Sequence, residues 1–187
     1  ERKMSMREVR LTMVNERLSS SPAVPLPSGF RFRYFADQDQ ETWINILTQA
    51  SEFPTLEAAQ DRFQTEFTST LPELGKRAVF LETNEGLPVG TAMGWYNTEF
   101  RDGNYGRLHW VSIIPPYQGK GLARPLVTKA LKILEANHTK AYLTTRPRSY
   151  KGIKLYLDYG FKPLTQTEHC REGWDLVAKT LGISIPL

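Results

Sequence analysis

The hydrophobic and polar positions of the chain alternate with two periods, which predicts a succession of strands and helices. In residues 30–35, Phe and Tyr alternate with Arg, the period of a half-buried strand. In residues 43–50, apolar side chains recur at helical spacing, and Asp37 is the predicted N-cap of that helix. The same spacing predicts a second helix over residues 55–71, which Pro72 ends.

The second half of the chain continues this alternation. Strands are predicted over residues 78–81, 89–96, 108–114, 142–145, 161–165 and 174–179. Helices are predicted over residues 122–134 and 150–159, and Gly160 closes the second of them. A turn at residues 84–86 joins the first two of these strands into an antiparallel hairpin. We therefore predict an α/β or mixed α+β fold, in which helices flank a central, mixed, mostly antiparallel sheet.

The first 28 residues have a different composition and form a predicted N-terminal extension. Residues 19–27 contain three serines and three prolines, which favour extended, unpaired chain. Apolar and polar residues alternate from position 9 to 14, so a short strand is expected there. The first 15 residues are charged and contain no apolar core of a signal peptide. Residues 29–187 are predicted to form one domain.

Composition and charge narrow the class of protein. No apolar run reaches the roughly 20 residues that cross a bilayer, so no membrane partner is expected. The net charge of +4 is spread along the chain, whereas a nucleic-acid-binding face needs a dense basic patch. Cys170 is the only cysteine, and with three histidines it argues against a structural zinc site. A lone cysteine also fits a reducing compartment, so we expect a cytoplasmic protein.

Residues 118–123, with the sequence Gln-Gly-Lys-Gly-Leu-Ala, lie where a predicted central strand turns into a helix. The first N–H groups of a helix have no partner within it, and the helix dipole adds positive charge there. Small residues at this place let an anion approach the backbone, as at a phosphate site. Local chemistry alone fits an ordinary tight turn equally well.

Two motifs resemble those of the GNAT N-acetyltransferase superfamily. The first is its acyl-CoA motif, Gln/Arg-x-x-Gly-x-Gly/Ala, which Gln118, Gly121 and Ala123 match. The second is a helix that ends in Leu-Tyr-x-x-x-Gly-Phe, matched by residues 155–161. The resemblance covers most of the chain after the extension. It implies a single GNAT-like domain, acetyl-CoA as cosubstrate and no metal.

The resemblance also implies which residues bind the cofactor. They are Ile113, Ile114, Gln118, Gly119, Lys120, Gly121, Leu122, Ala123, Arg124 and Ser149. Ile113 and Ile114 would act through backbone groups that pair with the pantetheine arm and polarise the thioester. Two positions depart from the family pattern. Ser149 stands where the family often has Asn, and Pro125 could make the first turn of the helix irregular.

Tyr156 and His109 are the candidate catalytic residues. The resemblance implies that Tyr156 protonates the leaving CoA sulfur, since a phenol is a donor at neutral pH. Without the resemblance, Tyr156 would be read as a core aromatic residue. His109 is the candidate base, because its unperturbed pKa of about 6.5 suits proton abstraction. A strand histidine satisfied by a hydrogen bond, or a site that uses ordered water, is the alternative; Glu99 and Asp102 are lesser candidates.

The function implied is transfer of an acetyl group from acetyl-CoA to a primary amine of a small molecule or amino acid derivative. An acyl-CoA-binding sensor or interaction module without turnover is one alternative. A protein or peptide N-acetyltransferase is another, with the extension helping to bind its partner. Nothing in the sequence separates a monomer from a homodimer.

Overall fold

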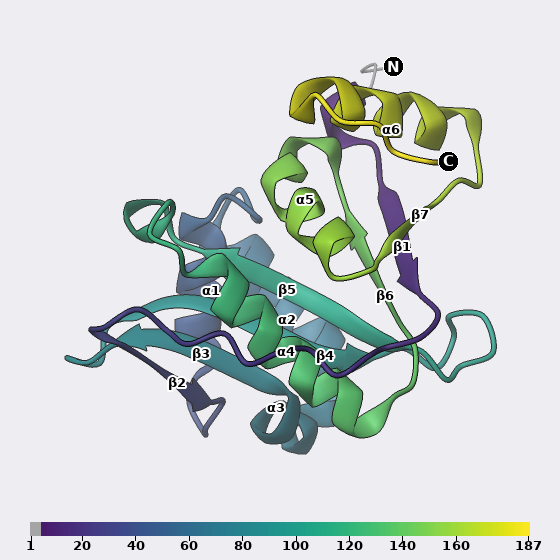
Figure 1. Cartoon of the computed structure of the whole chain (residues 1–187). Helices are drawn as coiled ribbons and strands as arrows, with labels where there is room; N and C mark the ends of the chain where they lie inside the picture. The colour runs from purple at the N-terminus through teal and green to yellow at the C-terminus, as the bar shows by residue number, and fades with distance from the viewer. Residues whose placement is uncertain (1–4) are drawn as a thin grey trace. The chain divides into compact units, whose positions relative to one another are not determined.

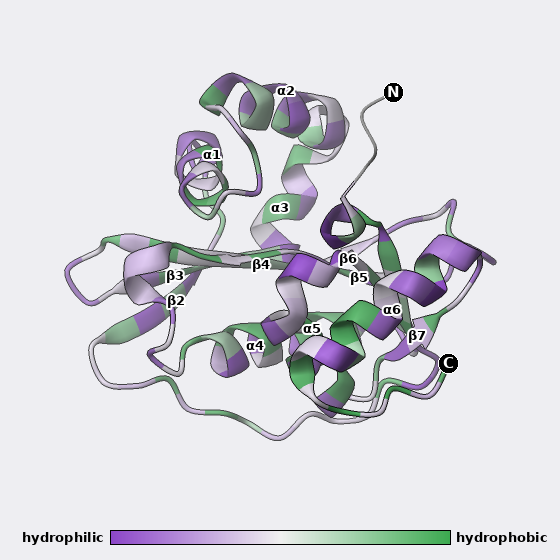
Figure 2. Cartoon of the chain, turned by 90° about the horizontal axis from the view of Figure 1, so that it is seen from above, coloured by the Kyte–Doolittle hydropathy of each residue, from purple (hydrophilic) through white to green (hydrophobic). Residues whose placement is uncertain are grey.

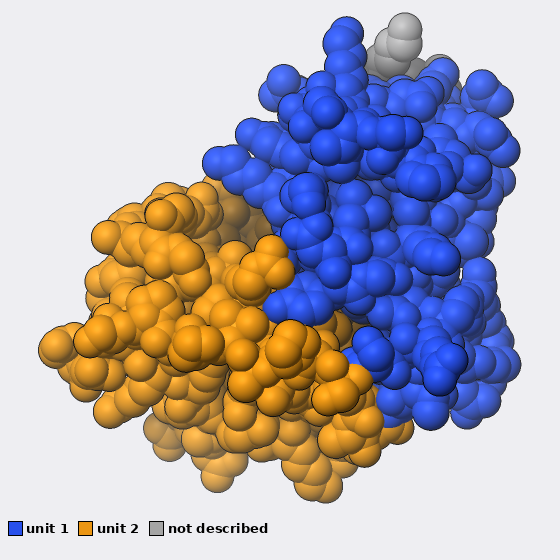
Figure 3. All heavy atoms as spheres, viewed as in Figure 1, with its two compact units in different colours: residues 1–19, 97–107, 138–187 blue, residues 20–96, 108–137 orange. Residues whose placement is uncertain are grey.

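The computed structural model describes residues 5–187, so the first four residues of the predicted extension lie outside it. The chain divides into two compact units, each described by itself (Figure 3). The terminal unit comprises residues 1–19, 97–107 and 138–187; the central unit comprises residues 20–96 and 108–137. Seven strands hydrogen-bond in the order β2-β3-β4-β5-β6-β1-β7 (Figure 1). Strand β5 contributes residues to both units.

Three strands and most of a fourth form the sheet of the central unit. They are β2 (Phe30–Tyr34), β3 (Ala78–Thr83), β4 (Pro88–Tyr96) and β5 (Gly106–Ile113). Strand β3 is buried along its whole length and pairs antiparallel with both β2 and β4. The predicted hairpin is therefore confirmed, with a turn at residues 84–86.

Helices cover both faces of the central sheet. On one face lie α1 (Gln40–Gln49), α2 (Leu56–Phe67) and α3 (Leu71–Arg77), and on the other lies α4 (Ala123–Asn137) (Figure 2). Helix α2 buries Ala59, Phe63 and Phe67, which are four residues apart and so share one face.

The predicted end of the second helix was wrong. Helix α2 ends at Phe67, a short 3-10 turn (Thr68–Thr70) follows, and Pro72 lies in the first turn of α3. A proline is harmless there because the first N–H groups of a helix need no partner within it. Pro72 therefore belongs to the first turn of α3, whereas the sequence pattern predicts that it ends the preceding helix.

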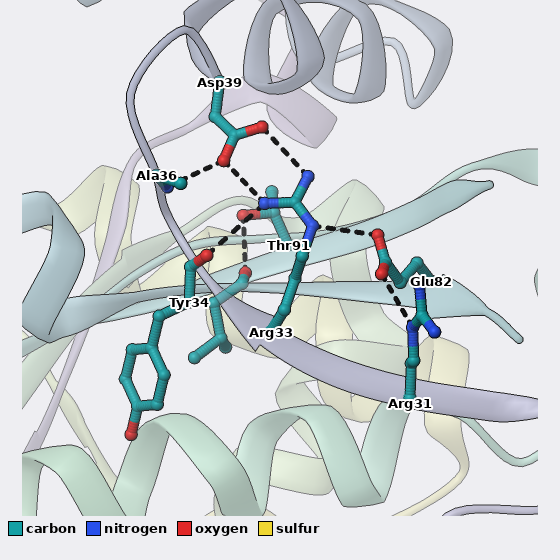
Figure 4. Close-up of polar contacts among 8 residues, drawn as sticks. Arg31, Arg33, Tyr34, Ala36, Asp39, Glu82 and Thr91 are labelled. Carbon is teal, nitrogen blue, oxygen red and sulfur yellow. Dashed lines mark hydrogen bonds and ion pairs between the residues drawn. The ribbon is translucent and has the colours of Figure 1, made fainter. Parts of the chain in front are cut away.

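The prediction for the start of α1 was also wrong, because Asp39 and not Asp37 occupies the N-cap position. The side chain of Asp39 does not cap the helix. Its Oδ2 accepts a hydrogen bond from the N–H of Ala36 at 2.7 Å, and both its oxygens accept from Arg33 at 2.6 and 2.9 Å. Arg33 also donates from Nε to Glu82 at 2.9 Å, so its guanidinium lies between two carboxylates (Figure 4).

This network makes the stability of the central unit sensitive to acid. Burial alone would raise the pKa of Asp39 and of Glu82. The hydrogen bonds and charge of Arg33, helped by the N–H of Ala36 at Asp39 and by Arg31 at Glu82, together outweigh burial and hold both pKa values below their ordinary 3.8 and 4.5. A carboxyl whose pKa is lowered in the folded state makes its full contribution to stability at a pH above its ordinary pKa. That contribution is lost as the pH falls through the ordinary pKa toward the pKa of the folded state.

We expect Asp39→Asn to lower the free energy of unfolding at pH 7 by about 1.5–3 kcal/mol, the scale of a hydrogen bond to a charged group. It should also remove the part that Asp39 contributes to the loss of stability as the pH falls from 7 to below the ordinary pKa of 3.8. Urea unfolding across this range measures both effects. Arg31→Met is the control: Arg31 pairs with Glu82 but its side chain is 54% exposed, so little change is expected. Equal losses in the two variants would contradict the assignment.

The terminal unit is built on β1 (Leu11–Asn15), which lies between β6 (Ala141–Thr145) and β7 (Lys162–Leu164). Both pairings of β1 are antiparallel, whereas the first two residues of β5 pair parallel with β6. The strand predicted near the N-terminus is therefore confirmed as part of the sheet. A short 3-10 turn (Met6–Glu8) precedes it, and residues 19–27 form no helix or strand.

Helix α5 (Tyr150–Asp158), which follows a 3-10 turn (Pro147–Ser149), agrees with the predicted helix. Gly160 has a φ of +86°, the left-handed backbone expected of a residue after a helix end.

The last predicted strand, residues 174–179, was wrong, because this segment lies within helix α6 (Glu168–Leu181). Thr167 caps the helix by accepting the N–H of Cys170, and Gly182 ends it with a φ of +64°. The buried residues Gly173, Trp174 and Val177 follow a helical spacing. Gly173 packs closely on β1, since an added Cβ would lie 3.0 Å from Leu11.

Candidate functional site

The segment from Gln118 to Ala123 forms an exposed loop between a 3-10 turn (Pro115–Tyr117) and α4. Gly119 and Gly121 have φ values of +73° and +76°, and a Cβ added at either would meet nothing within 4 Å. These glycines are therefore needed for backbone conformation and leave open space above the loop. Among the described residues, the N–H groups of positions 119–122 donate to no backbone oxygen.

The helix behind this loop begins regularly in spite of Pro125. Helix α4 starts at Ala123, which places Pro125 in the first turn, where no N–H is required. The first bond across this turn runs from the N–H of Leu126 to the carbonyl of Leu122 at 3.1 Å. The start of α4 therefore adds its dipole to the unpaired N–H groups of the loop, as an anion site requires.

The side chain of Gln118 is engaged in holding the loop. Its Nε2 donates to the carbonyl of Ile113 at 2.8 Å, so it ties the loop to the last residue of β5. The side chain of Gln118 therefore holds the loop in place, so the cofactor role predicted for it would be to position the backbone amides of the loop. Leu122 is buried and anchors the other end of the loop in the core.

The N–H of Ile114, one of the two positions predicted to contact the thioester, already has a backbone partner. The N–H of Ile114 donates to the carbonyl of Val89 at 2.9 Å within the central unit. It cannot polarise a thioester without breaking that bond, because one N–H is shared poorly between two acceptors. Ile113, the last residue of β5, stays the predicted position for this contact.

Two basic residues of the segment are exposed, as the prediction requires. The ammonium of Lys120 lies 6.0 Å from the ring centroid of Tyr117, close enough for a cation–π contact. Arg124 is in the first turn of α4, and its carbonyl accepts a hydrogen bond from Thr128 at 2.8 Å. Both cations therefore lie beside the loop that carries the unpaired N–H groups.

His109 lies on β5 and is only 7% exposed. Its Nε2 is in hydrogen-bond contact with Oε1 of Glu66 on α2. Glu66 also accepts a hydrogen bond from Nε1 of Trp110 at 3.2 Å through its second oxygen. Sequence reasoning missed Glu66, because 43 residues separate it from His109 and it belongs to no motif.

Tyr156 and Ser149 belong to the terminal unit, on and before α5. The ring of Tyr156 is half-buried and packs edge-to-face on Phe161, with centroids 6.5 Å apart. A Cβ added at Gly152 would lie 3.4 Å from the Tyr156 hydroxyl, so the glycine one turn earlier leaves room around that oxygen. Ser149 occupies the N-cap position of α5, but its hydroxyl does not cap the helix.

The terminal unit contains Glu99 and Asp102, the two lesser candidates for the general base, and the surroundings of Asp102 make it a poorer base. Lys140 forms an ion pair with Asp102 and lowers the pKa of that carboxyl below its ordinary value. A lowered pKa makes a poorer base at neutral pH. Glu99 is exposed on the loop between β4 and β5.

Within residues 5–187, no group of three or more His, Cys, Asp and Glu side chains is arranged to hold a metal, and no helix is long and apolar enough to span a bilayer.

Comparison with known proteins identifies the family. The model of the acetyltransferase (GNAT) family matches residues 40–161, which include β5, the 118–123 loop and α5. The match covers more than half of the chain, which therefore belongs to the GNAT acetyltransferase family. Members of this family are enzymes that depend on acetyl-CoA. No curated protein sequence matches the chain significantly.

Solved structures share the fold. A GCN5-related N-acetyltransferase from Sphaerobacter thermophilus is 22% identical, with a TM-score of 0.65 over 84% of this chain and 50% of that protein. One from Kribbella flavida is 19% identical, with a TM-score of 0.54 over 83% of this chain and 55% of that protein. The chain thus spans about half the length of these two proteins, and the likeness confirms the predicted α/β fold.

A third structure with this fold comes from a larger enzyme. It is described as a GCN5-related glucosamine N-acetyltransferase region in a fungal multi-domain GH3 β-N-acetylglucosaminidase. It is 12% identical, with a TM-score of 0.60 over 83% of this chain and 20% of that protein.

Proposed function

We propose that the chain transfers an acetyl group from acetyl-CoA to a primary amine of a small molecule. The observation that carries the proposal is the row of N–H groups at the exposed positions 119–121, which have no backbone partner and stand before the dipole of α4. Such a row suits the pyrophosphate of a coenzyme, because several unpaired donors and the positive end of a helix act on one anion. Lys120 and Arg124 supply further positive charge beside it.

Acetyl-CoA supplies the thioester, and the chain supplies orientation and proton transfer. The amine nitrogen attacks the thioester carbonyl, the carbon–sulfur bond breaks, and the amine loses one proton while the sulfur gains one. We assign proton uptake from the amine to His109 and proton donation to the sulfur to Tyr156. The room that Gly152 leaves around the Tyr156 hydroxyl supports the second role. The N–H of Ile113 is proposed to polarise the thioester carbonyl.

A small amine acceptor suits the chemistry around His109. Trp43, Phe53 and Trp110 form a cluster of aromatic rings beside it, with centroids 5.2 to 6.0 Å apart. Aromatic faces attract cations, so an ammonium group would be drawn to this region before it loses its proton. Glucosamine, the substrate in the description of the fungal region, belongs in a first panel of amines.

The test is release of free thiol from acetyl-CoA in the presence of single amines. The panel should contain glucosamine, amino acid amides, aromatic alkylamines and a lysine-containing peptide. Saturable release with a small amine supports the proposal. Release with the peptide alone would favour a peptide acetyltransferase. Acetyl-CoA binding by calorimetry without release for any amine would favour a binding module, and a melting temperature unchanged by acetyl-CoA would contradict the site itself.

The anion role of the loop predicts the effect of Gly121→Asp. A carboxylate at this position would repel phosphate, so the affinity for CoA should fall about tenfold beyond that of Gly121→Asn. Asparagine has the same shape and equal tolerance of a positive φ, so this comparison isolates charge from crowding. Calorimetric titration of CoA measures both variants. Equal affinities for the two would contradict the phosphate role of the loop.

A further inference from the structure

Two consecutive residues of β5 bind the same carboxylate. His109 contacts Oε1 of Glu66 through Nε2, and Trp110 donates to Oε2 of Glu66 at 3.2 Å. In a regular strand, neighbouring side chains point to opposite faces, so one carboxylate could not reach both. The local backbone must therefore depart from a regular strand.

The departure lies at Trp110, which has a φ of +48°. A non-glycine residue pays about 1–2 kcal/mol for this left-handed backbone, and such strain persists only where its surroundings hold it. The hydrogen bond to Glu66 and the packing of Trp110 against Trp43 and Phe53, at 5.5 and 5.2 Å between centroids, provide that hold. Helix α2 thus determines how this part of β5 is turned.

The contact also selects the proton positions of His109. A neutral imidazole that donates from Nε2 carries its lone pair on Nδ1, which is the nitrogen able to take up a proton. Because His109 is buried, the negative charge of Glu66 acts on the ring with little screening. It therefore stabilises the positive charge that the ring gains when it accepts a proton.

We propose that Glu66 is a positioning residue that holds His109 in the tautomer and orientation of a base. The inference rests on the proposed function, because it takes proton uptake by His109 as the step that Glu66 supports. Glu66 itself need not touch either substrate.

The first experiment is Glu66→Gln with steady-state kinetics. The amide keeps the size of the side chain but removes its charge, so kcat should fall about tenfold with KM for acetyl-CoA within about twofold. Glu66→Asp retains a carboxylate with a shorter reach and should recover part of the loss. Glu73→Gln is the matched control. Glu73 on α3 also forms ion pairs, but its partners in them are Lys76 and Arg77.

A double-mutant cycle separates positioning from a structural role. In the background of His109→Gln, the change Glu66→Gln should alter kcat less than about twofold, because the residue that it positions is gone. An equal tenfold loss in both backgrounds would overturn the proposal. An unchanged kcat for Glu66→Gln in the unaltered background would overturn it as well.

A second measurement needs no turnover. The chain has three histidines, so the imidazole N–H signals of ¹⁵N-labelled protein are few, and His109→Gln assigns the one from His109. We expect a slowly exchanging Nε2–H signal that Glu66→Gln shifts or removes and Trp110→Phe alters less. If Glu66→Gln shifts or removes the signal but no amine is acetylated, the proposed function is contradicted. The claim that Glu66 holds the imidazole of His109 is then still supported. A signal that Glu66→Gln leaves unchanged overturns the positioning whatever the activity.

Discussion

The variant Tyr156→Phe is expected to lower kcat by about 10²- to 10⁴-fold, the range that positioned acid–base groups contribute. The physical reason is that the departing thiolate would lose its proton donor, while the ring that packs on Phe161 is kept. The affinity for CoA should stay within about twofold of that of the unaltered chain, since the phosphate-binding loop is untouched. Thiol-release kinetics and calorimetric titration of CoA measure the two quantities.

Tyr159→Phe is the control for this variant. Tyr159 follows the last residue of the same helix, at the C-cap position, and its carbonyl accepts a hydrogen bond from Asn15 that the substitution leaves in place. Its kcat should therefore match that of the unaltered chain. An unchanged kcat for Tyr156→Phe, or an equal loss in both variants, would remove Tyr156 from the proposed acid role.

The variant Gly94→Ala is expected to lower the free energy of unfolding by about 2–3 kcal/mol, the cost of overpacking a close-packed core. A Cβ at this position of β4 would lie 2.8 Å from the carbonyl oxygen of Ala130 and from Cβ and Cγ2 of Ile133. Both residues are on α4, and a backbone oxygen in a helix cannot rotate away. The whole helix would have to shift, and the loop at its start would shift with it. Urea unfolding measures the loss of stability.

Two comparisons make this prediction specific. Gly75→Ala lies in α3 and would place its Cβ 3.5 Å from the nearest atom outside the helix, an ordinary contact, so it should stabilise by about 0.5–1 kcal/mol. Gly94→Ala combined with Ile133→Ala should not restore full stability, since the contact with the Ala130 oxygen remains. A stability of Gly94→Ala equal to that of the unaltered chain would contradict this account of the packing.

The loop from Gln118 to Ala123 could be predicted because its properties are local. Glycines that take a positive φ and a helix start follow from neighbouring residues, whereas the regular first turn around Pro125 is a finding of the structure. The hairpin of β3 and β4 was predictable for the same reason, since turn residues join two strands that are adjacent in the sequence. The motifs then connected the loop to the family that the comparison confirms.

The errors arose where burial decided the structure. Only Trp174 and Val177 of the segment 174–179 favour a strand, and the caps at Thr167 and Gly182 and the packing of Gly173 on Leu11 make it part of a helix. Pro72 was assigned as a stop although it starts α3, because proline is equally compatible with either side of a helix boundary. The contact of Gly173 with Leu11 joins residues far apart in the chain, and the assignment of Pro72 depends on which side of it the helix lies.

The sequence by itself thus determined the order of most elements, the glycine-bearing turn into a helix at residues 118–123 and the motifs of the family, because short-range spacing encodes all three. Only the tertiary structure decided that Glu66 meets His109 and Trp110, that the N–H of Ile114 is taken by Val89, and that Gly94 lies against α4. These contacts join residues that are 25 to 44 positions apart or depend on one strained backbone angle. No local pattern records such pairs, since they exist only once the sheet and its helices have packed.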